Sequence, residues 1–372
     1  TQLTQYKVLI LRVGYDEKKH GYINPCEHVI QNTLPQRTRR ENSYKPRPFM
    51  PPGDKEAYLC NIIVDENTNG NKFMLTENKE ESFQDETIIE FRYDTTKDKH
   101  WRWIPIRVRH DKTAEYRKGV KNYGNAYHVA LSVWKSIHNP ITKKMICTGE
   151  NIPDYMDDTD TYYHGGGNSK TKPLRDFHNR VVKKILITKV AKPNNTLLDL
   201  AVGKGGDIPK WIQANLSFVF GIDISRDNIE NRRDGVCTRY LNSKMRNKNM
   251  FDGLFIQGDS GKKIKSGESF YTDKGREIAK AIFGSGPKDE MKIGKLPYKY
   301  YGIGKDGFDI VSTQFAIHYF FESKKKLNTY LQNISNCCKM GGYFIGTCYD
   351  GKAMFEELKE VENGDSITAL KE

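Results

Sequence analysis

The sequence has 372 residues, which is long enough for two domains, because a single hydrophobic core seldom grows beyond about 250 residues. Its 60 lysines and arginines against 47 aspartates and glutamates give a net charge of +13, which favours a polyanionic partner such as nucleic acid; a solvated basic surface is the alternative. No apolar run approaches the ~18 residues of a membrane span. The seven cysteines are scattered and include no C-x-x-C pair, so they predict neither a zinc site nor a disulfide scaffold. They indicate a reducing compartment.

Strand-like runs dominate the first third of the chain. They lie at 6–13, 57–64 and 87–94, and loops rich in proline, asparagine and charge separate them. Several short strands with polar connections are typical of a small antiparallel barrel or sheet. We therefore predict a mostly-β domain over residues 1–120, about the size of an oligonucleotide-binding barrel.

A basic stripe follows at 101–112, where aliphatic residues alternate with Arg107 and Arg109. Strand periodicity would place both guanidinium groups on one face, where they could bind phosphates. A half-exposed strand with solvated charges is the alternative.

Residues 121–173 are predicted to connect two domains. The spacing of apolar residues at 125–138 favours a helix that bridges the domains, and Pro140 ends it. Acids, tyrosines and three consecutive glycines at 152–173 are typical of a linker.

The most informative stretch is 196–207, which predicts a buried strand that runs into a glycine turn and then a helix. A second strand, 218–223, ends in Asp223, where a strand-helix-strand unit places an acid to bind ribose hydroxyls. The turn departs from the dinucleotide pattern G-x-G-x-x-G because Asp207 stands where a phosphate would be repelled. A cationic sulfonium ligand suits this acidic turn better; simple strand-to-helix packing is the alternative.

The rest of the chain continues this alternation. The pattern predicts a helix over 174–191 before the turn, further core strands at 309–312 and 342–347, and a lysine-rich insertion at 261–305 with one helix. Alternating strands and helices indicate a parallel α/β sheet. The second domain is therefore predicted to be a Rossmann-like fold over 174–372.

The second domain resembles the cellular and viral mRNA cap guanine-N7 methyltransferases. The turn at 198–207 is similar to their cofactor motif, the run 314–319 to their guanine-pocket signature, and 341–347 to the strand that follows it. The resemblance implies that the domain transfers a methyl group from S-adenosylmethionine to N7 of the guanine cap. The chain stops short of the final antiparallel strands of this family, so we expect the domain to be C-terminally incomplete.

The first domain has a resemblance of its own. Residues 103–112 are similar to the last motif of GTP:RNA guanylyltransferases, which implies phosphate contacts for Arg107, Arg109 and Lys112. The whole chain thus resembles the C-terminal part of the multifunctional capping enzyme of a large cytoplasmic DNA virus. The Lys-x-Asp-Gly nucleophile motif does not occur in it, so guanylyl transfer by this chain alone is not expected.

The resemblance also assigns site residues. It implies cofactor contacts for Lys183, Ala201, Gly203, Asp223, Asp259, Gln314 and Tyr319. It implies cap contacts for His178, Asn179, Phe315, His318 and Tyr319. His178 departs from the asparagine pair of the family, and Lys183 matches the family lysine only with a one-residue insertion, which leaves Lys184 as the competitor.

The chemistry needs no general base, because guanine N7 carries a lone pair and no proton to remove. We therefore expect positioning and electrostatics to carry catalysis, with no catalytic acid or base and no metal. The expected partners are capped RNA, the rest of the capping enzyme and a possible viral partner subunit, in the host cytoplasm or the virion. Two alternatives stay open: a methyltransferase for a protein or small molecule, and a non-catalytic cap-binding or regulatory module.

Overall fold

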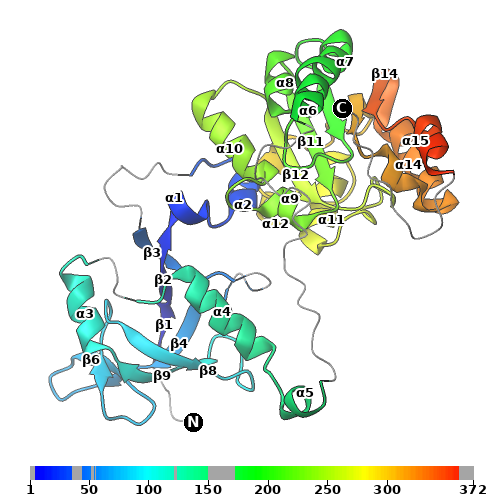
Figure 1. Cartoon of the computed structure of the whole chain (residues 1–372). Helices are drawn as coiled ribbons and strands as arrows, with labels where there is room; N and C mark the ends of the chain where they lie inside the picture. Colours follow the sequence, from blue (N-terminus) through cyan, green and yellow to red (C-terminus); the bar gives the residue numbers. More distant parts are fainter. Residues whose placement is uncertain are drawn as a thin grey trace. The chain divides into compact units, whose positions relative to one another are not determined.

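The structure is a computed structural model that describes residues 5–35, 44–51, 54, 56–120, 124–149 and 172–359. The chain divides into two compact units, which are described separately here (Figure 1). Unit 1 comprises Thr1–Ile23 and Arg37–Met156, and unit 2 comprises Asn24–Gln36 and Asp157–Glu372. The chain therefore passes between the two units three times. The predicted bounds at 120 and 173 stay predictions.

Unit 1 is mostly β, as predicted. Its elements are β1 (Tyr6–Ile10), β2 (Arg12–Asp16), α1 (Glu17–His20), β3 (Tyr44–Pro48), β4 (Leu59–Ile63), β5 (Asp65–Glu66), β6 (Lys72–Leu75), β7 (Ser82–Phe83), β8 (Ile89–Tyr93), β9 (Trp103–Val108), α3 (His110–Arg117), α4 (Tyr127–His138) and α5 (Lys143–Thr148). The strands pair antiparallel in four small sheets: β1 with β4, β2 with β3, β6 with both β5 and β7, and β8 with β9.

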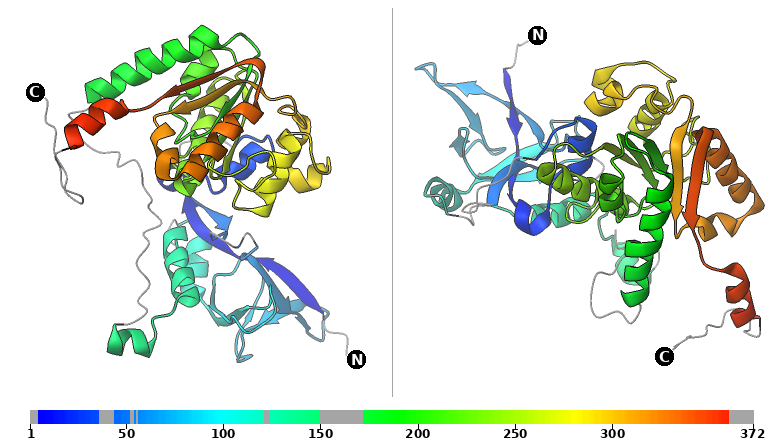
Figure 2. Two further views of the ribbon diagram at one scale, coloured as in Figure 1. Left: turned by 90° about the vertical axis from the view of Figure 1, so that its right-hand side faces the viewer. Right: turned by 90° about the horizontal axis from the view of Figure 1, so that it is seen from above.

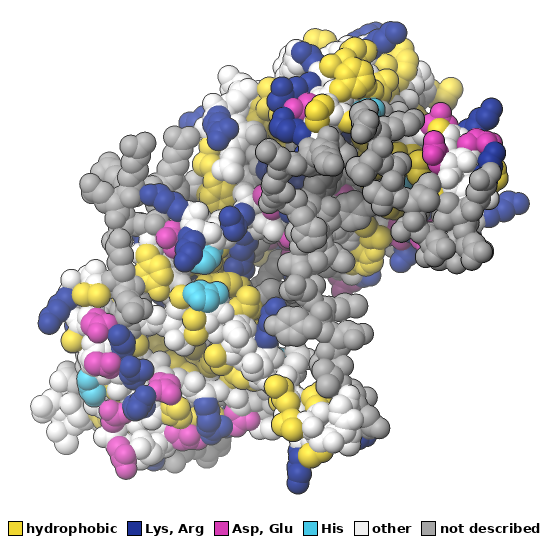
Figure 3. Space-filling model, in the orientation of Figure 1, with side chains coloured by type: hydrophobic (Ala, Val, Ile, Leu, Met, Phe, Trp, Pro, Cys, Tyr) yellow, Lys and Arg dark blue, Asp and Glu magenta, His cyan; other side chains and the backbone are white. Residues whose placement is uncertain are grey.

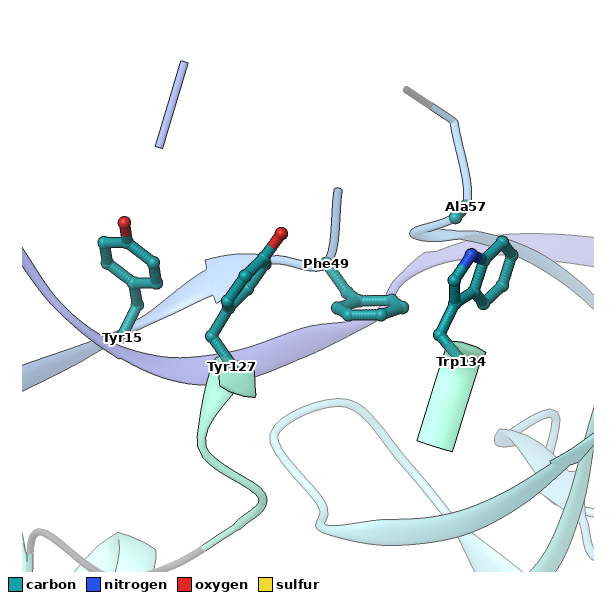
Figure 4. Close-up of a cluster of buried hydrophobic side chains, with 5 residues drawn as sticks. All are labelled: Tyr15, Phe49, Ala57, Tyr127 and Trp134. Carbon is teal, nitrogen blue, oxygen red and sulfur yellow. The ribbon is translucent and has the colours of Figure 1, made fainter. Parts of the chain in front are cut away.

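Two groups of buried side chains hold unit 1 together. One consists of Tyr15, Phe49, Ala57, Tyr127 and Trp134 (Figure 4). The other consists of Cys60, Ile62, Met74, Phe83 and Val108. The predicted helix at 125–138 is present as α4; Tyr127 and Trp134 are buried in the core, Ala130 and Leu131 pack against it, and Val133 is 50% exposed. The buried side chains of α4 thus pack within unit 1, and its role as a bridge stays a prediction.

Unit 2 begins with a short helix from the first part of the chain. Its elements are α2 (Pro25–Ile30), α6 (Lys172–Phe177), the π-helix η1 (His178–Val182), α7 (Lys183–Val190), β10 (Thr196–Asp199), α8 (Ile208–Gln213), β11 (Phe218–Asp223), α9 (Arg226–Glu230), α10 (Val236–Arg246), β12 (Asp252–Gln257), α11 (Asp273–Ile282), α12 (Glu290–Ile293), α13 (Lys295–Lys299), β13 (Phe308–Gln314), the 3₁₀ helix η2 (Ile317–Glu322), α14 (Lys324–Cys337), β14 (Cys338–Thr347) and α15 (Gly351–Leu358). No helix in the described ranges is long and apolar enough to cross a membrane.

The centre of unit 2 is a five-stranded parallel sheet with the order β12-β11-β10-β13-β14. Helices cover both of its faces (Figure 2), and the strands are therefore nearly continuous apolar runs: every residue of β11 is buried. From β10 the chain adds β11 and then β12 on one side of the sheet, and it returns to add β13 and β14 on the other side. The strand order therefore reverses between β10 and β13. This confirms the predicted Rossmann-like fold, in which ligands bind beyond the carboxyl ends of the strands at such a reversal.

Helix α2 packs on unit 2 although the sequence prediction placed residues 24–36 in the first domain. Pro25 and Val29 are buried, and the helix contacts α10, β12 and α13. Glu27 pairs with Lys274 of α11 at 3.6 Å. No periodicity in a six-residue helix could reveal this long-range packing.

The helix predicted at 174–191 is present as α6, η1 and α7, which follow one another without a break (Figure 2). The apolar spacing of this helix predicts a buried stripe of Phe177, Val181, Val182, Ile185 and Leu186. That stripe is wrong: Phe177 and Ile185 are each 54% exposed, and Ile187, which is not part of it, is fully buried. The π-helical turn adds residues to the helical register, so the side chains after Val182 do not continue the face that precedes it.

Candidate active site

The glycine turn after β10 has the backbone geometry that its glycines allow. Gly203 and Gly205 have φ values of +55° and +72°, in the left-handed region that favours glycine. A Cβ atom on Gly205 would lie 2.8 Å from side-chain atoms of Ile208 and Val236, whereas one on Gly203 would have no atom within 4 Å. Gly205 therefore allows the helix to pack, and Gly203 leaves open space beside the turn. The Ala201 N–H donates to Asp199 Oδ1 at 3.0 Å and closes the turn.

Asp223 lies at the carboxyl end of β11, beside this turn. Its Oδ2 accepts a hydrogen bond from the Gly203 N–H at 2.7 Å, and its Oδ1 accepts from the Ser225 N–H at 3.0 Å and from Asn228 Nδ2 at 2.9 Å. Burial raises the pKa of Asp223, and these three donors partly oppose the rise. Asn228 Oδ1 is buried and has no hydrogen-bond partner within the described residues. Asp223 and Asn228 thus offer acceptor oxygens to a ligand with hydroxyl donors.

Two further carboxylates, Asp199 and Asp207, complete an acidic group with Asp223. Burial, the largest contribution, raises the pKa of Asp199 to about 7, and repulsion by Asp207 and Asp223 adds to the rise. Asp207 is paired with two lysines, Lys210 at 2.7 Å and Lys183 at 3.4 Å. The uncompensated negative charge of the group therefore lies on the Asp199 and Asp223 side, where it would attract a cation.

Phe315 follows β13 in a strained conformation. Its φ is +57°, which is unusual for a residue with a side chain and costs on the order of 1–3 kcal/mol. Its N–H donates to Thr347 O at 2.9 Å and to Thr347 Oγ1 at 3.1 Å. Thr347 Oγ1 in turn donates to Gln314 Oε1 at 3.0 Å, and Gln314 Nε2 donates to Ser312 Oγ at 3.2 Å. Buried Gln314 thus helps to fix the backbone that orients the Phe315 ring.

Aromatic side chains surround Phe315 and form what we call the aromatic group: His178, Phe315, His318, Tyr319 and Tyr349. The His178 ring lies edge-on to Phe315 at 4.9 Å, and the His318 ring lies 4.2 Å from Tyr319 and 4.9 Å from Tyr349. Burial lowers the pKa of His318, so its imidazole is neutral near pH 7. His178 Nδ1 and His318 Nδ1 are both buried and lack a hydrogen-bond partner among the described residues.

Lys183 joins the acidic group to the aromatic group. Its Nζ lies 3.4 Å from Asp207 Oδ2 and 5.6 Å from the centre of the Phe315 ring. It is the first residue after the π-helical turn η1, and its assignment as the family lysine stays a prediction. Lys184, the competing lysine, is exposed. The structure therefore places predicted cofactor and cap residues side by side at one edge of the sheet.

The other predicted residues take more peripheral places. Asp259 follows β12, and its Oδ1 accepts from the Gly261 N–H at 2.8 Å. Asn179 is exposed beside His178 on η1. Two residues of the site were missed in the sequence, Asn228 and Tyr349. Tyr349 comes two residues after β14, and its place at the carboxyl end of a predicted core strand was the available signal.

The basic residues of unit 1 form ion pairs. Strand β9 ends at Val108, so Arg109 does not share the strand face with Arg107 that the alternation predicted; Arg109 precedes α3, and Lys112 lies in α3. Arg107 pairs with Glu90 at 2.7 Å, Arg109 with Asp111 at 3.1 Å and Lys112 with Glu115 at 2.7 Å. Basic and acidic side chains alternate over this part of the surface in the lower left of Figure 3.

Two models of known families match the chain. The model of the mRNA (guanine-N(7))-methyltransferase domain matches residues 153–369. The chain belongs to this family. Residues 49–147 match the mRNA capping enzyme, C-terminal domain. Unit 2 is accordingly called the methyltransferase unit below.

Three relatives illustrate the match. The chain is 31% identical over 295 residues to a probable mRNA-capping enzyme of Acanthamoeba polyphaga mimivirus, covering 75% of this chain and 24% of the relative. It is 33% identical over 201 residues to mRNA cap guanine-N(7) methyltransferase of Saccharomyces cerevisiae, covering 52% of this chain and 38% of the relative. It is 31% identical over 197 residues to mRNA cap guanine-N(7) methyltransferase 1 of Arabidopsis thaliana, covering 51% of this chain and 43% of the relative. The chain spans less than half the length of each.

The cofactor that this membership implies is S-adenosylmethionine, and the methyltransferase unit fits it in three respects. The open space at Gly203 admits a ligand against the turn. The buried oxygen of Asn228 beside Asp223 suits the two hydroxyls of a ribose. Asp199 forms no ion pair among the described residues, so its carboxylate, once ionised, suits a positively charged sulfur.

The raised pKa of Asp199 predicts that cofactor affinity depends on pH. In the free protein, burial favours the protonated acid up to about pH 7. A cationic ligand favours the carboxylate, so its affinity should rise as the pH increases to about 7 and then level off, by up to about tenfold in total. Calorimetry between pH 5.5 and 8 measures this. Asp199→Asn should remove the rise, and S-adenosylhomocysteine, with a neutral sulfur, should show a smaller one; a flat profile for the unmutated protein would contradict the assignment.

Proposed function

We propose that the chain transfers a methyl group from S-adenosylmethionine to N7 of the guanine cap of mRNA. One observation carries the proposal: Lys183 lies between the acidic group and the aromatic group, 3.4 Å from Asp207 and 5.6 Å from the centre of the Phe315 ring. A site for a cationic donor and a surface that can stack a purine are thus neighbours, as methyl transfer between the two requires.

The proposed roles follow from the contacts of each residue. Asp223 and Asn228 accept the ribose hydroxyls of the cofactor, and the turn at Ala201 and Gly203 holds its amino-acid end. Gln314 supports the site through the backbone of Phe315, and Asp259 lies beyond the end of β12, where it can reach the adenine. When bound, S-adenosylmethionine supplies an electrophilic methyl group.

On the substrate side, the rings of Phe315, Tyr319 and Tyr349 stack on the guanine, and neutral His318 hydrogen-bonds its edge or its ribose. The unpartnered Nδ1 atoms of His178 and His318 are ready to bond polar groups of the cap. Since N7 carries its own lone pair, no residue needs to remove a proton. The site therefore acts by orientation and by charge, consistent with its carboxylates, the lysines beside them and its aromatic rings.

Labelling tests the proposal directly. The protein is incubated with methyl-labelled S-adenosylmethionine together with unmethylated GpppN-ended RNA, GTP and a protein substrate, and digestion of the RNA should release labelled 7-methylguanosine. Label in the protein substrate would instead favour a protein methyltransferase. Cofactor and cap binding without any transfer would favour the non-catalytic module.

The match of unit 1 to the C-terminal domain of mRNA capping enzymes supports a wider proposal. Here the chain acts in viral mRNA capping in the host cytoplasm, on RNA whose cap the rest of the capping enzyme builds. Guanylyl transfer is a task for that remainder, because this sequence lacks the Lys-x-Asp-Gly motif. A viral partner subunit is part of the same proposal.

We expect Arg107 and Arg109 to increase RNA affinity through contacts with phosphates. This contribution should weaken as salt rises and should not depend on the RNA sequence. Replacing both by alanine should weaken RNA binding at low salt. It should also make the slope of log affinity against log salt concentration shallower by about 1.4, because each phosphate contact with single-stranded RNA contributes about 0.7. Glu90→Gln is the matched control: it releases Arg107 from its ion pair and should strengthen binding. Unchanged affinity in the double variant would show that unit 1 does not bind RNA through this stripe.

A further inference from the structure

Two cysteines that are far apart in the sequence meet within the methyltransferase unit. Cys26 Sγ of α2 and Cys237 Sγ of α10 are 3.0 Å apart, and both are free thiols. A disulfide bond is about 2.05 Å long, so the two sulfur atoms need to approach by about 1 Å. Helices α2 and α10 are packed against each other, which holds the pair together.

We propose that Cys26 and Cys237 form a redox modification site, at which a low-molecular-weight disulfide such as glutathione disulfide converts the two thiols into a protein disulfide. The pair has the asymmetry that this exchange requires. Cys26 is half-buried, which gives a reagent partial access to this residue, whereas Cys237 is fully buried with its Sγ 3.0 Å from Cys26 Sγ. The site does not depend on the methyl-transfer proposal.

The reaction proceeds in two balanced exchanges. The thiolate of Cys26 attacks glutathione disulfide, which forms a mixed disulfide and releases one glutathione. The thiolate of Cys237 then attacks Cys26 Sγ, which forms the protein disulfide and releases the second glutathione. The protein loses two protons and two electrons, and one glutathione disulfide is reduced to two glutathione molecules.

The position of the pair gives the bond a structural consequence. Cys26 Sγ also lies 3.7 Å from Ile229 O in α9, and the preceding residue, Asn228, donates its hydrogen bond to Asp223. The disulfide would therefore fasten α2 directly behind the helix that supports the proposed ribose carboxylate. Residues 24–35, which are held in the reduced protein by α2 with its buried Pro25 and Val29, would become covalently attached.

Oxidation of the full chain tests the site. The protein is equilibrated with glutathione buffers from reducing to oxidising, and non-reducing proteolytic maps are read by mass spectrometry. We expect a cross-linked peptide pair containing residues 26 and 237, the loss of two titratable thiols, and a melting temperature several degrees higher that dithiothreitol reverses, because a cross-link over a long loop restricts the unfolded chain.

Variants and alternative outcomes keep the test decisive. Cys26→Ser should abolish the cross-link and the temperature shift, and Cys348→Ser, at an exposed cysteine, should change neither. The peptide map of the unmutated protein decides the matter even if a variant folds poorly. Two free thiols under oxidising conditions, or a reaction that stops at a glutathione adduct on Cys26, would overturn the proposal.

Discussion

The substitution Phe315→Ala is expected to lower kcat/KM for capped RNA about 10- to 100-fold, because stacking of a base on an aromatic ring contributes about 1–3 kcal/mol. The affinity for S-adenosylmethionine should change little, since the acidic group keeps its hydrogen bonds when the ring is removed. Methyl-transfer kinetics with GpppN-ended RNA and calorimetry with the cofactor measure the two effects separately.

The left-handed backbone of Phe315 provides a matched control. Phe315→Gly removes the same ring, but glycine adopts a φ of +57° without strain. It should therefore lose as much activity as Phe315→Ala, while its free energy of unfolding should exceed that of Phe315→Ala by roughly 1 kcal/mol. Phe315→Trp keeps a stacking surface and should retain most of the activity. Loss of cofactor and cap binding together in the alanine variant would indicate a folding defect rather than a lost cap contact.

The substitution Asp223→Ala should abolish measurable binding of both S-adenosylmethionine and S-adenosylhomocysteine, with a loss of about 100-fold or more. A hydrogen bond from a ribose hydroxyl to this carboxylate contributes about 1.5–3 kcal/mol, and the carboxylate also holds the Gly203 N–H of the turn at 2.7 Å and Asn228 Nδ2 at 2.9 Å, so its removal disturbs both neighbours of the ribose. Calorimetry or a ligand-induced shift of the melting temperature measures the loss.

Two comparisons separate this effect from general destabilisation. Asp223→Asn keeps the shape and one carbonyl acceptor, so it should bind more weakly than the unmutated protein but better than the alanine variant. Asp306→Ala changes an exposed carboxylate of the same unit away from the site and should bind normally. Full cofactor affinity in Asp223→Ala would remove Asp223 from the binding site.

The parts of the site that local sequence could predict are those built by consecutive residues. The run from Thr196 to Asp207 specifies a strand, a turn and a helix start, and Asp223 follows at the end of the next strand; all are present. Apolar runs of this kind are diagnostic because a parallel strand covered on both faces has no polar side. The Rossmann-like architecture could therefore be predicted.

The parts that escaped prediction depend on contacts between distant segments. Tyr349, from the segment after β14, contacts His318 of η2, and a periodicity of 3.6 residues cannot reveal the π-helical turn before Lys183. The basic stripe of unit 1 was predicted as one strand, but β9 ends at Val108 because a helix begins at His110. In addition, Arg107 and Arg109 each form an ion pair with a nearby carboxylate. Neither the end of a strand nor an ion pair can be read from alternation alone.

The passage of residues 24–36 onto the methyltransferase unit has a practical consequence for dissecting the protein. A single cut between the units cannot yield an intact second half, because α2 would leave with the first. The fragment would expose the surface of α10, β12 and α13 that buries Pro25 and Val29. It should aggregate or melt early, and a separately supplied peptide of residues 20–36 should bind it and partly restore its solubility.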